Sequence, residues 1–166
     1  MDPTAAVTAL HWQLLRFTEL RLDDLYELLR LRSEVFVVEQ RCAYLDADGK
    51  DRHADAHHLL GRTPDGELAA YLRLLPPGLS FAAASFGRVV TSPRQRGRGY
   101  GDALVARALL HAHELWPHSG LTIGAQAHLA GYYGKHGFVV CSDEFLEDDI
   151  PHVHMQRAPD GSATAR

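Results

Sequence analysis

The sequence has few cysteines, no long apolar run and no excess of positive charge, and each absence excludes a class of protein. Its two cysteines, Cys42 and Cys141, form no C-x-x-C pair. They therefore supply neither a zinc pattern nor a redox dithiol, and this usage fits a reducing cytoplasm. No apolar run approaches the roughly 18 residues of a membrane-spanning helix. A formal net charge of −4 over 166 residues disfavours general nucleic-acid binding. We therefore expect a cytoplasmic protein with no membrane and no nucleic-acid partner.

One domain is predicted, because the length suits a single core and no internal repeat is visible. We expect this domain at residues 11–157, between a flexible leader at residues 1–10, without secretory-signal features, and a disordered tail at residues 158–166. Periodicity and turn signals predict strands at residues 11–17, 57–62, 67–75, 85–91, 121–126, 138–141 and 153–157. Helices are predicted at residues 23–36, before Pro117 and at residues 128–136, with an irregular loop at residues 41–56. This order indicates an α+β (mixed α/β) fold, a mixed sheet flanked by helices.

A basic, glycine-rich stretch stands out against the acidic background. Residues 88–107 contain five arginines and one aspartate, a local charge of +4 that leaves about −8 for the rest of the chain. Within it, RGRGYG lies between a predicted strand and a predicted helix. Glycines let successive backbone N–H groups face one concavity, and a helix N-terminus adds partial positive charge. Arginine donates well to phosphate. The stretch therefore predicts a phosphate or pyrophosphate site, with a ligand-free surface turn as the alternative.

Two common phosphate loops do not match this stretch. A dinucleotide fingerprint needs G-x-G-x-x-G, whereas Gly97, Gly99 and Gly101 are spaced G-x-G-x-G and Asp102 stands at the position of the third glycine. A P-loop needs Gly-Lys followed by Ser or Thr, and the Gly-Lys pair at 134–135 precedes His136.

A different signature does match. Arg96-x-x-Gly99-x-Gly101 resembles the R/Q-x-x-G-x-G/A loop of the GNAT superfamily of N-acetyltransferases, which holds the pyrophosphate of acetyl-CoA. AHLAGYYGKHGF (127–138) resembles the family segment A-x-x-F-Y-x-K-x-G-F, with Tyr133 on its tyrosine, and Gln126 stands where many members have Asn. Five further segments resemble the ElaA-like subgroup of this superfamily. They are RSEVFVVEQRCAYLDADGKD (32–51), HHLLG (57–61), GRVV (87–90), GAQAHL (124–129) and IPHVHM (150–155).

The resemblance implies a central mixed, mostly antiparallel sheet flanked by helices. It also implies a splayed fourth and fifth strand that admit the pantetheine arm of acetyl-CoA. The cosubstrate is then acetyl-CoA, with no metal. The acceptor is a small-molecule or peptide amine, and the protein a monomer or homodimer. The implied cofactor-binding residues are Val89, Val90, Thr91, Arg96, Gly97, Arg98, Gly99, Tyr100, Gly101, Asp102 and Gln126.

Acetyl transfer to an amine needs a neutral amine, a stabilised oxyanion and a donor for the departing thiolate. Tyr133 is the candidate donor. A phenol titrates near ~10 and a thiol near ~8.5, so the proton would move late. Backbone N–H groups at residues 89–91 are the candidate oxyanion donors.

The general base stays open among several groups. Glu39 follows the apolar run VFVV, and burial there would raise its pKa; a solvated glutamate at a helix end is the alternative. His58 is an alternative, as are His152 and His154, which a strand projects to one face. A water-mediated base is another option. The acids of residues 46–51 and 143–149 would attract a cationic amine, or else form a solvated face.

His53, Asp55, His57 and His58 lack a known ligand spacing, so we expect no metal. The favoured function is N-acetyl transfer by direct attack of an amine on the thioester. The alternatives are a non-catalytic acyl-CoA-binding module and an acyltransferase like the acyl-homoserine lactone synthases, which VFVVEQ (35–40) also resembles.

Overall fold

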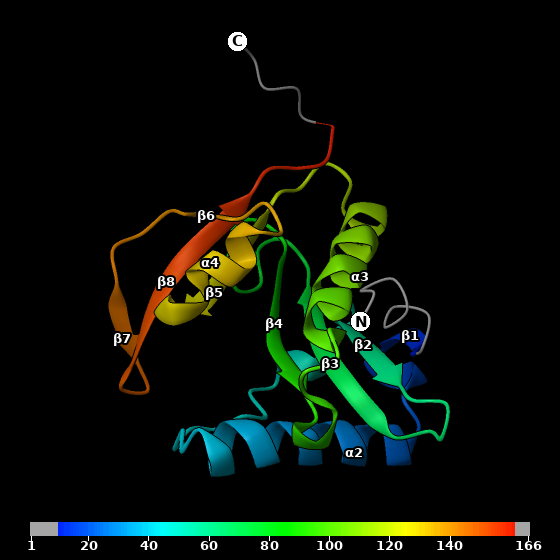
Figure 1. Ribbon diagram of the computed structural model, residues 1–166. Coiled ribbons are helices and arrows are strands. Elements are labelled where there is room, and N and C mark those ends of the chain that lie inside the picture. The colour runs from blue at the N-terminus through cyan, green and yellow to red at the C-terminus, as the bar shows by residue number, and fades with distance from the viewer. Residues whose placement is uncertain (1–9, 162–166) are drawn as a thin grey trace.

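The computed structural model describes residues 10–161, and within them the strands form two antiparallel sheets that lie side by side (Figure 1). The first sheet has the order β1-β2-β3-β4. Its strands are β1 His11–Arg16, β2 His57–Arg62, β3 Leu68–Leu75 and β4 Ser85–Thr91. In the second sheet β5 and β6 flank β8, and β7 also pairs with β8. Its strands are β5 Leu121–Gln126, β6 Val139–Val140, β7 Phe145–Glu147 and β8 Ile150–Arg157.

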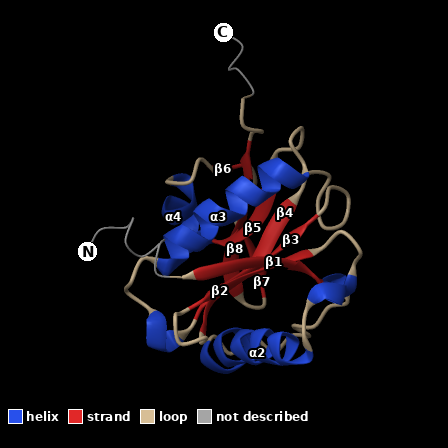
Figure 2. Ribbon diagram, turned by 90° about the vertical axis from the view of Figure 1, so that its right-hand side faces the viewer, coloured by secondary structure: helices blue, strands red, loops and turns tan. Residues whose placement is uncertain are grey.

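Helices cover both faces of the first sheet (Figure 2). The helix α2 Leu22–Arg32 packs on one face, where Leu28 and Leu31 meet Tyr71. The helix α3 Tyr100–Leu115 packs on the other, where Leu104 and its neighbours meet Leu72. Because alternate residues of a strand face opposite sides, β3 is buried along its whole length. This explains why its sequence is apolar at nearly every position.

Two features of β4 prepare the cavity described below. The first is its junction with β5: a parallel bridge joins Ala84 to Leu121, and Thr122 N donates to Ala84 O at 3.0 Å. Beyond this bridge β4 and β5 belong to different sheets and do not pair. They therefore form the splayed pair that the family resemblance implies.

The second feature is a bulge. Tyr71 pairs with Val90 and Arg73 with Gly87, so Arg88 and Val89 together face the single residue Leu72. Arg88 has a φ of 53°, which is uncommon outside glycine. A bulge of this kind bends the strand and redirects its side chains.

The predicted elements appear close to their expected positions, with three differences. The helix predicted at residues 23–36 ends at Arg32 and continues as the π-helix Ser33–Glu39. The helix predicted at 128–136 is shorter, α4 Ala130–Gly134. β7 was not predicted. Residues 1–9 and 162–166 lie outside the described residues, and Leu10, assigned to the leader, belongs to the core. Across residues 10–161, no helix has the length and apolarity needed to cross a bilayer.

Candidate active site

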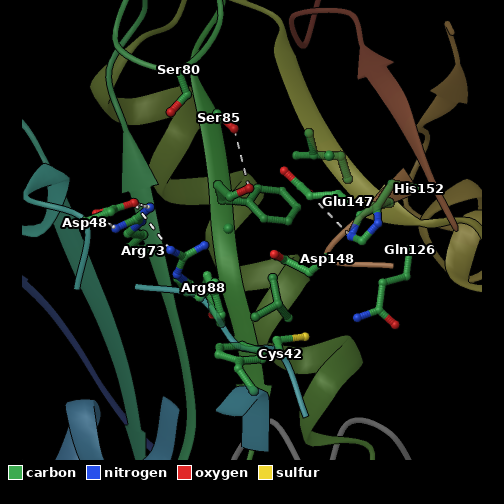
Figure 3. Close-up of a pocket in the computed structure, with 18 of the residues that line it drawn as sticks. Cys42, Asp48, Arg73, Ser80, Ser85, Arg88, Gln126, Glu147, Asp148 and His152 are labelled. Carbon is green, nitrogen blue, oxygen red and sulfur yellow. Dashed lines mark hydrogen bonds and ion pairs between the residues drawn. The ribbon is translucent and has the colours of Figure 1, made fainter. Parts of the chain in front are cut away.

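A cavity of about 570 Å³ opens between the splayed strands β4 and β5 (Figure 3). Residues 85–89 of β4 form one wall and residues 123–126 of β5 another. The segment that follows the π-helix contributes Cys42 and Asp48, and the β7–β8 turn contributes Glu147 and Asp148. The cavity thus draws on both sheets and on the loop at residues 41–56.

Tyr133 of α4 lines this cavity. Its ring packs against Phe86 and Phe138, each with a centroid distance of 6.2 Å. Its hydroxyl has no hydrogen-bond partner within residues 10–161, although the residue is only 7% exposed. Burial raises the pKa of Tyr133 to about 12. The phenol therefore keeps its proton at neutral pH and is available to donate a hydrogen bond into the cavity.

The glycines of the basic stretch each have a structural reason. Gly97 and Gly99 have φ values of 77° and 78°, a region that favours glycine. Gly99 is the N-cap of α3. A Cβ at Gly101 would lie 3.1 Å from Tyr132 Oη. The first N–H groups of α3 have no intrahelical acceptor, so they can bind an anion, as the sequence predicts.

The arginines of this stretch are less available than the sequence suggests. Arg94 pairs with Glu67 at 3.1 Å, and Arg96 Nη2 lies 2.7 Å from Glu39 Oε1. Arg98 is exposed and has no ion-pair partner among residues 10–161. Of these three side chains, Arg98 is the one that can bind a phosphate without first breaking an ion pair with a carboxylate.

Three other predicted cofactor-binding residues have partners of their own. The Asp102 carboxylate lies 3.0 Å from His136 Nε2. Tyr100 is buried in the core, so only its backbone faces the loop. Gln126 lines the cavity and its amide donates to Gln40 Oε1 at 3.2 Å. On β4, Val89 lines the cavity, Val90 is buried against α2, and Thr91 pairs with Ala70.

Two of the three predicted catalytic residues do not reach the cavity. Of the two environments predicted for Glu39, the structure shows the solvated one: its side chain is 44% exposed and pairs with Arg96. His58 is fully buried in the first sheet. Its Nδ1 lies 2.7 Å from Tyr71 Oη and its Nε2 lies 2.9 Å from Asp51 O. Burial lowers its pKa. Both ring nitrogens of His58 are therefore occupied, and neither Glu39 nor His58 lines the cavity.

His152 of β8 does line the cavity. Its Nδ1 lies 2.7 Å from the carbonyl oxygen of Ile150, which fixes Nδ1 as the donor. In the neutral ring, Nε2 then carries the lone pair. Glu147 Oε2 lies 3.5 Å from Nε2, where it would stabilise a protonated ring. His154, on the same strand, instead packs its ring against Phe81 and Phe145.

The loop at residues 41–56 contains a feature that the sequence did not reveal. Its acids were expected to attract a cationic amine or to be solvated, yet three of them join three arginines in a closed ring of alternating charge. Around it the closest N–O distances are Arg32–Asp46 2.8 Å, Asp46–Arg88 2.9 Å, Arg88–Asp48 3.4 Å, Asp48–Arg73 2.6 Å, Arg73–Asp51 3.1 Å and Asp51–Arg32 2.7 Å. We call these six residues the charge ring.

The charge ring sits partly inside the protein, with the Arg32 side chain fully buried. Burial alone would raise the carboxyl pKa values, but Arg73 holds the pKa of Asp48 well below its usual range, and Arg32 lowers the pKa of Asp51. One sequence signal was available, because Arg73 interrupts the apolar strand LAAYLRLL. A charge at such a position needs a partner. The acids of residues 46–51 are therefore paired and do not form the expected acidic, solvated face.

Comparison with known proteins agrees with this geometry. The family model described as "Acetyltransferase (GNAT) domain" matches residues 34–158. Protein ElaA of Escherichia coli is 41% identical over 148 residues, which are 89% of this chain and 96% of ElaA. The crystal structure of ElaA has a TM-score of 0.83 at 40% identity, covering 89% of this chain and 99% of that one.

An acyl-CoA N-acyltransferase from Pseudomonas aeruginosa has a TM-score of 0.85 at 49% identity, covering 90% of this chain and 99% of that chain. The fold predicted from the resemblance is confirmed by these matches, and so is the resemblance to ElaA. The residues matched and the identities establish that the chain belongs to the GNAT acetyltransferase family of acyl-CoA N-acyltransferases.

Proposed function

We propose that the protein transfers the acetyl group of acetyl-CoA to the amine of an acceptor by direct attack on the thioester. The observation that carries this proposal is Tyr133, whose hydroxyl has no protein partner within residues 10–161 and whose side chain lines the cavity between β4 and β5. A buried phenol that keeps its proton is suited to stabilise a departing thiolate.

The cofactor is held by backbone more than by side chains. Its pyrophosphate binds the N–H groups at the start of α3, between Gly97 and Asp102, with Arg98 at the rim. Support comes from the left-handed glycines and from the absence of a carboxylate on Arg98 within residues 10–161. The pantetheine arm runs along β4 at Val89–Thr91, beside Gln126. That proposal is supported by β4 pairing with a strand on one side only.

The chemical step forms one bond and breaks one. The amine nitrogen attacks the thioester carbon, and the oxyanion is stabilised by backbone N–H groups near the bulge of β4, where one residue falls outside the ladder. The C–S bond then breaks. The proton lost by nitrogen passes to His152 Nε2, directly or through water, and the thiolate takes a hydrogen bond and finally a proton from Tyr133. His152 then releases its proton to solvent and Tyr133 regains one from solvent, so both side chains return to their starting states. The products are the N-acetyl amine and CoA with a free thiol.

His152 is preferred as the base over Glu39 and His58 because it lines the cavity and has an unprotonated Nε2 in its neutral form. Glu147 at 3.5 Å favours the imidazolium that forms. Tyr133 has the pKa of a weak acid, so proton transfer to sulfur completes late and the hydrogen bond provides most of the stabilisation.

The experiment combines CoA binding with thiol release. Calorimetry should detect CoA binding at micromolar concentration, and acetyl-CoA plus a mixture of amines should release free thiol. Tyr133→Phe should lower kcat by about 100-fold with little change in the CoA dissociation constant. Tyr132→Phe is the matched control and should retain kcat. No CoA binding would overturn the proposal, and binding without thiol release would favour a non-catalytic acyl-CoA-binding module.

A further inference from the structure

The cavity beside Tyr133 has two walls of different charge. Figure 3 shows Asp48, Arg73 and Arg88 on one side of it and Glu147, Asp148 and His152 on the other. Lys50 and Ser80 also line the cavity. We call the side with Lys50, Arg73 and Arg88 the basic wall, and the side with Glu147 and Asp148 the acidic wall.

The excess charge of the basic wall comes from Lys50. Within the charge ring, three arginines are balanced by three aspartates, so the ring as a whole is neutral. Lys50 has no carboxylate partner among residues 10–161, and its Nζ donates to Ser80 Oγ at 2.8 Å. One uncompensated cation therefore faces the cavity from this wall.

Arg88 adds hydrogen-bond donors that the ring leaves unused. Its Nε lies 2.9 Å from Asp46 Oδ1, and its Nη2 lies 3.1 Å from Asp46 O. Its Nη1 bonds no group of residues 10–161, and the side chain is 22% exposed. The bulge and the positive φ of Arg88 fix this orientation. Lys50 and Arg88 line the same cavity, and a lysine together with a free guanidinium edge is suited to bind a carboxylate.

The acidic wall has the opposite property. Asp148 has no cationic partner among residues 10–161, and the contact of Glu147 is with His152. An amine in neutral water is a cation, so these carboxylates attract it. His152 then stands where the amine must lose its proton.

We infer that the acceptor is a small amine that also carries a carboxylate, such as an amino acid. Its carboxylate binds at Lys50 and Arg88, and its amine binds at Glu147 and His152. This inference rests on the proposed acetyl transfer, because it names the acceptor class of that reaction. Diamines and polyamines, which lack an anionic end, are the competing class.

The test compares each acid with its own amide, which keeps the amine and removes the negative charge. Glycine, β-alanine and γ-aminobutyrate provide three separations between the two groups, and putrescine represents the diamines. With acetyl-CoA saturating, at least one acid should have a kcat/KM about tenfold or more above that of its amide. The best acid should also exceed putrescine.

Charge reversal at Lys50 sharpens the result. Lys50→Glu should remove the preference for the acid and favour putrescine, so the ratio of the two kcat/KM values inverts. Arg52→Glu is the matched control, because Arg52 lies on the same short helix, Lys50–Arg52, is exposed and does not line the cavity. That variant should keep the ratio of the unmodified protein.

The outcomes separate the two levels of the proposal. Failure of CoA to bind would remove the acetyl transfer itself, and the inference with it. If CoA binds but acids and amides react equally, or if putrescine or an amide is acetylated and no acid in the series is, the acceptor class is wrong and the transfer reaction stands. Lys50→Glu could also lower kcat/KM for the acid and for putrescine by the same factor. That result would show a structural role for Lys50 and overturn its assignment as the carboxylate-binding residue.

Discussion

Two groups of three arginines lie near this cavity, and they differ in what their charges do. Arg94, Arg96 and Arg98 lie on an exposed loop, where two of them pair with single glutamates. Arg32, Arg73 and Arg88 belong to the charge ring, and each contacts two aspartates. Of the loop arginines, Arg98 has no ion-pair partner among residues 10–161 and is available for a ligand. The ring uses its charge to hold the segment at residues 46–51 against β3 and β4, and so shapes one wall of the cavity.

The largest expected effect is on stability. Arg32→Met would remove one of the two arginines that contact each of the largely buried Asp46 and Asp51. We expect this loss to lower the free energy of unfolding by about 3–5 kcal/mol. Arg94→Met removes an exposed pair with Glu67 and should cost less than about 1 kcal/mol. Urea unfolding followed by circular dichroism measures both. Similar losses in the two variants would contradict the distinction between ring and loop.

The second expected effect is a dependence of stability on pH that comes from the ring. The pKa of Asp48 is lowered in the folded state by Arg73, so its contribution is complete above the unfolded pKa of about 3.9 and is lost as the pH falls through the folded pKa. Unfolding free energies measured from about pH 5 to about pH 3 should therefore fall less steeply in Asp48→Asn than in the unmodified protein.

Asp65→Asn provides the control for that measurement, since Asp65 lies in the exposed turn between β2 and β3. Its slope should match that of the unmodified protein. Identical slopes in all three proteins would mean that the ring does not set the acid sensitivity.

The difference between ring and loop also explains what could be predicted from the sequence. The loop was recognisable as a candidate pyrophosphate site because its glycines and arginines are close together in the sequence. Their spacing matches a known family signature. The ring joins residues between positions 32 and 88, and no local pattern connects them. Arg73 within an apolar strand indicated a buried partner but not which one. The bulge at Arg88 was equally hidden, because the glycine before it, Gly87, does not by itself distinguish a bulge from regular strand pairing.

The strands were predictable because turn residues mark their ends and their apolar residues extend over several positions. β7 has only three residues, Phe145–Glu147, too few to show a period. The sequence left open whether Glu39 is buried or solvated, because an apolar run precedes it. Val37 and Val38 of that run are exposed, at 36% and 69%. Glu39 ends a surface π-helix and pairs with Arg96 of the loop.

The smallest expected effect distinguishes the arginines within the loop. Arg98→Gln should raise the CoA dissociation constant by about tenfold, because a charged hydrogen bond to phosphate is lost. Arg96→Gln should raise it less, since Glu39 already holds that guanidinium at 2.7 Å. Glu39→Gln should then tighten CoA binding slightly by releasing Arg96, with no loss of kcat if His152 is the base. Calorimetry at two salt concentrations checks all three variants. If Glu39→Gln instead abolished turnover while CoA still bound, Glu39 and not His152 would be the base, and the loop would take part in the chemistry as well as in binding.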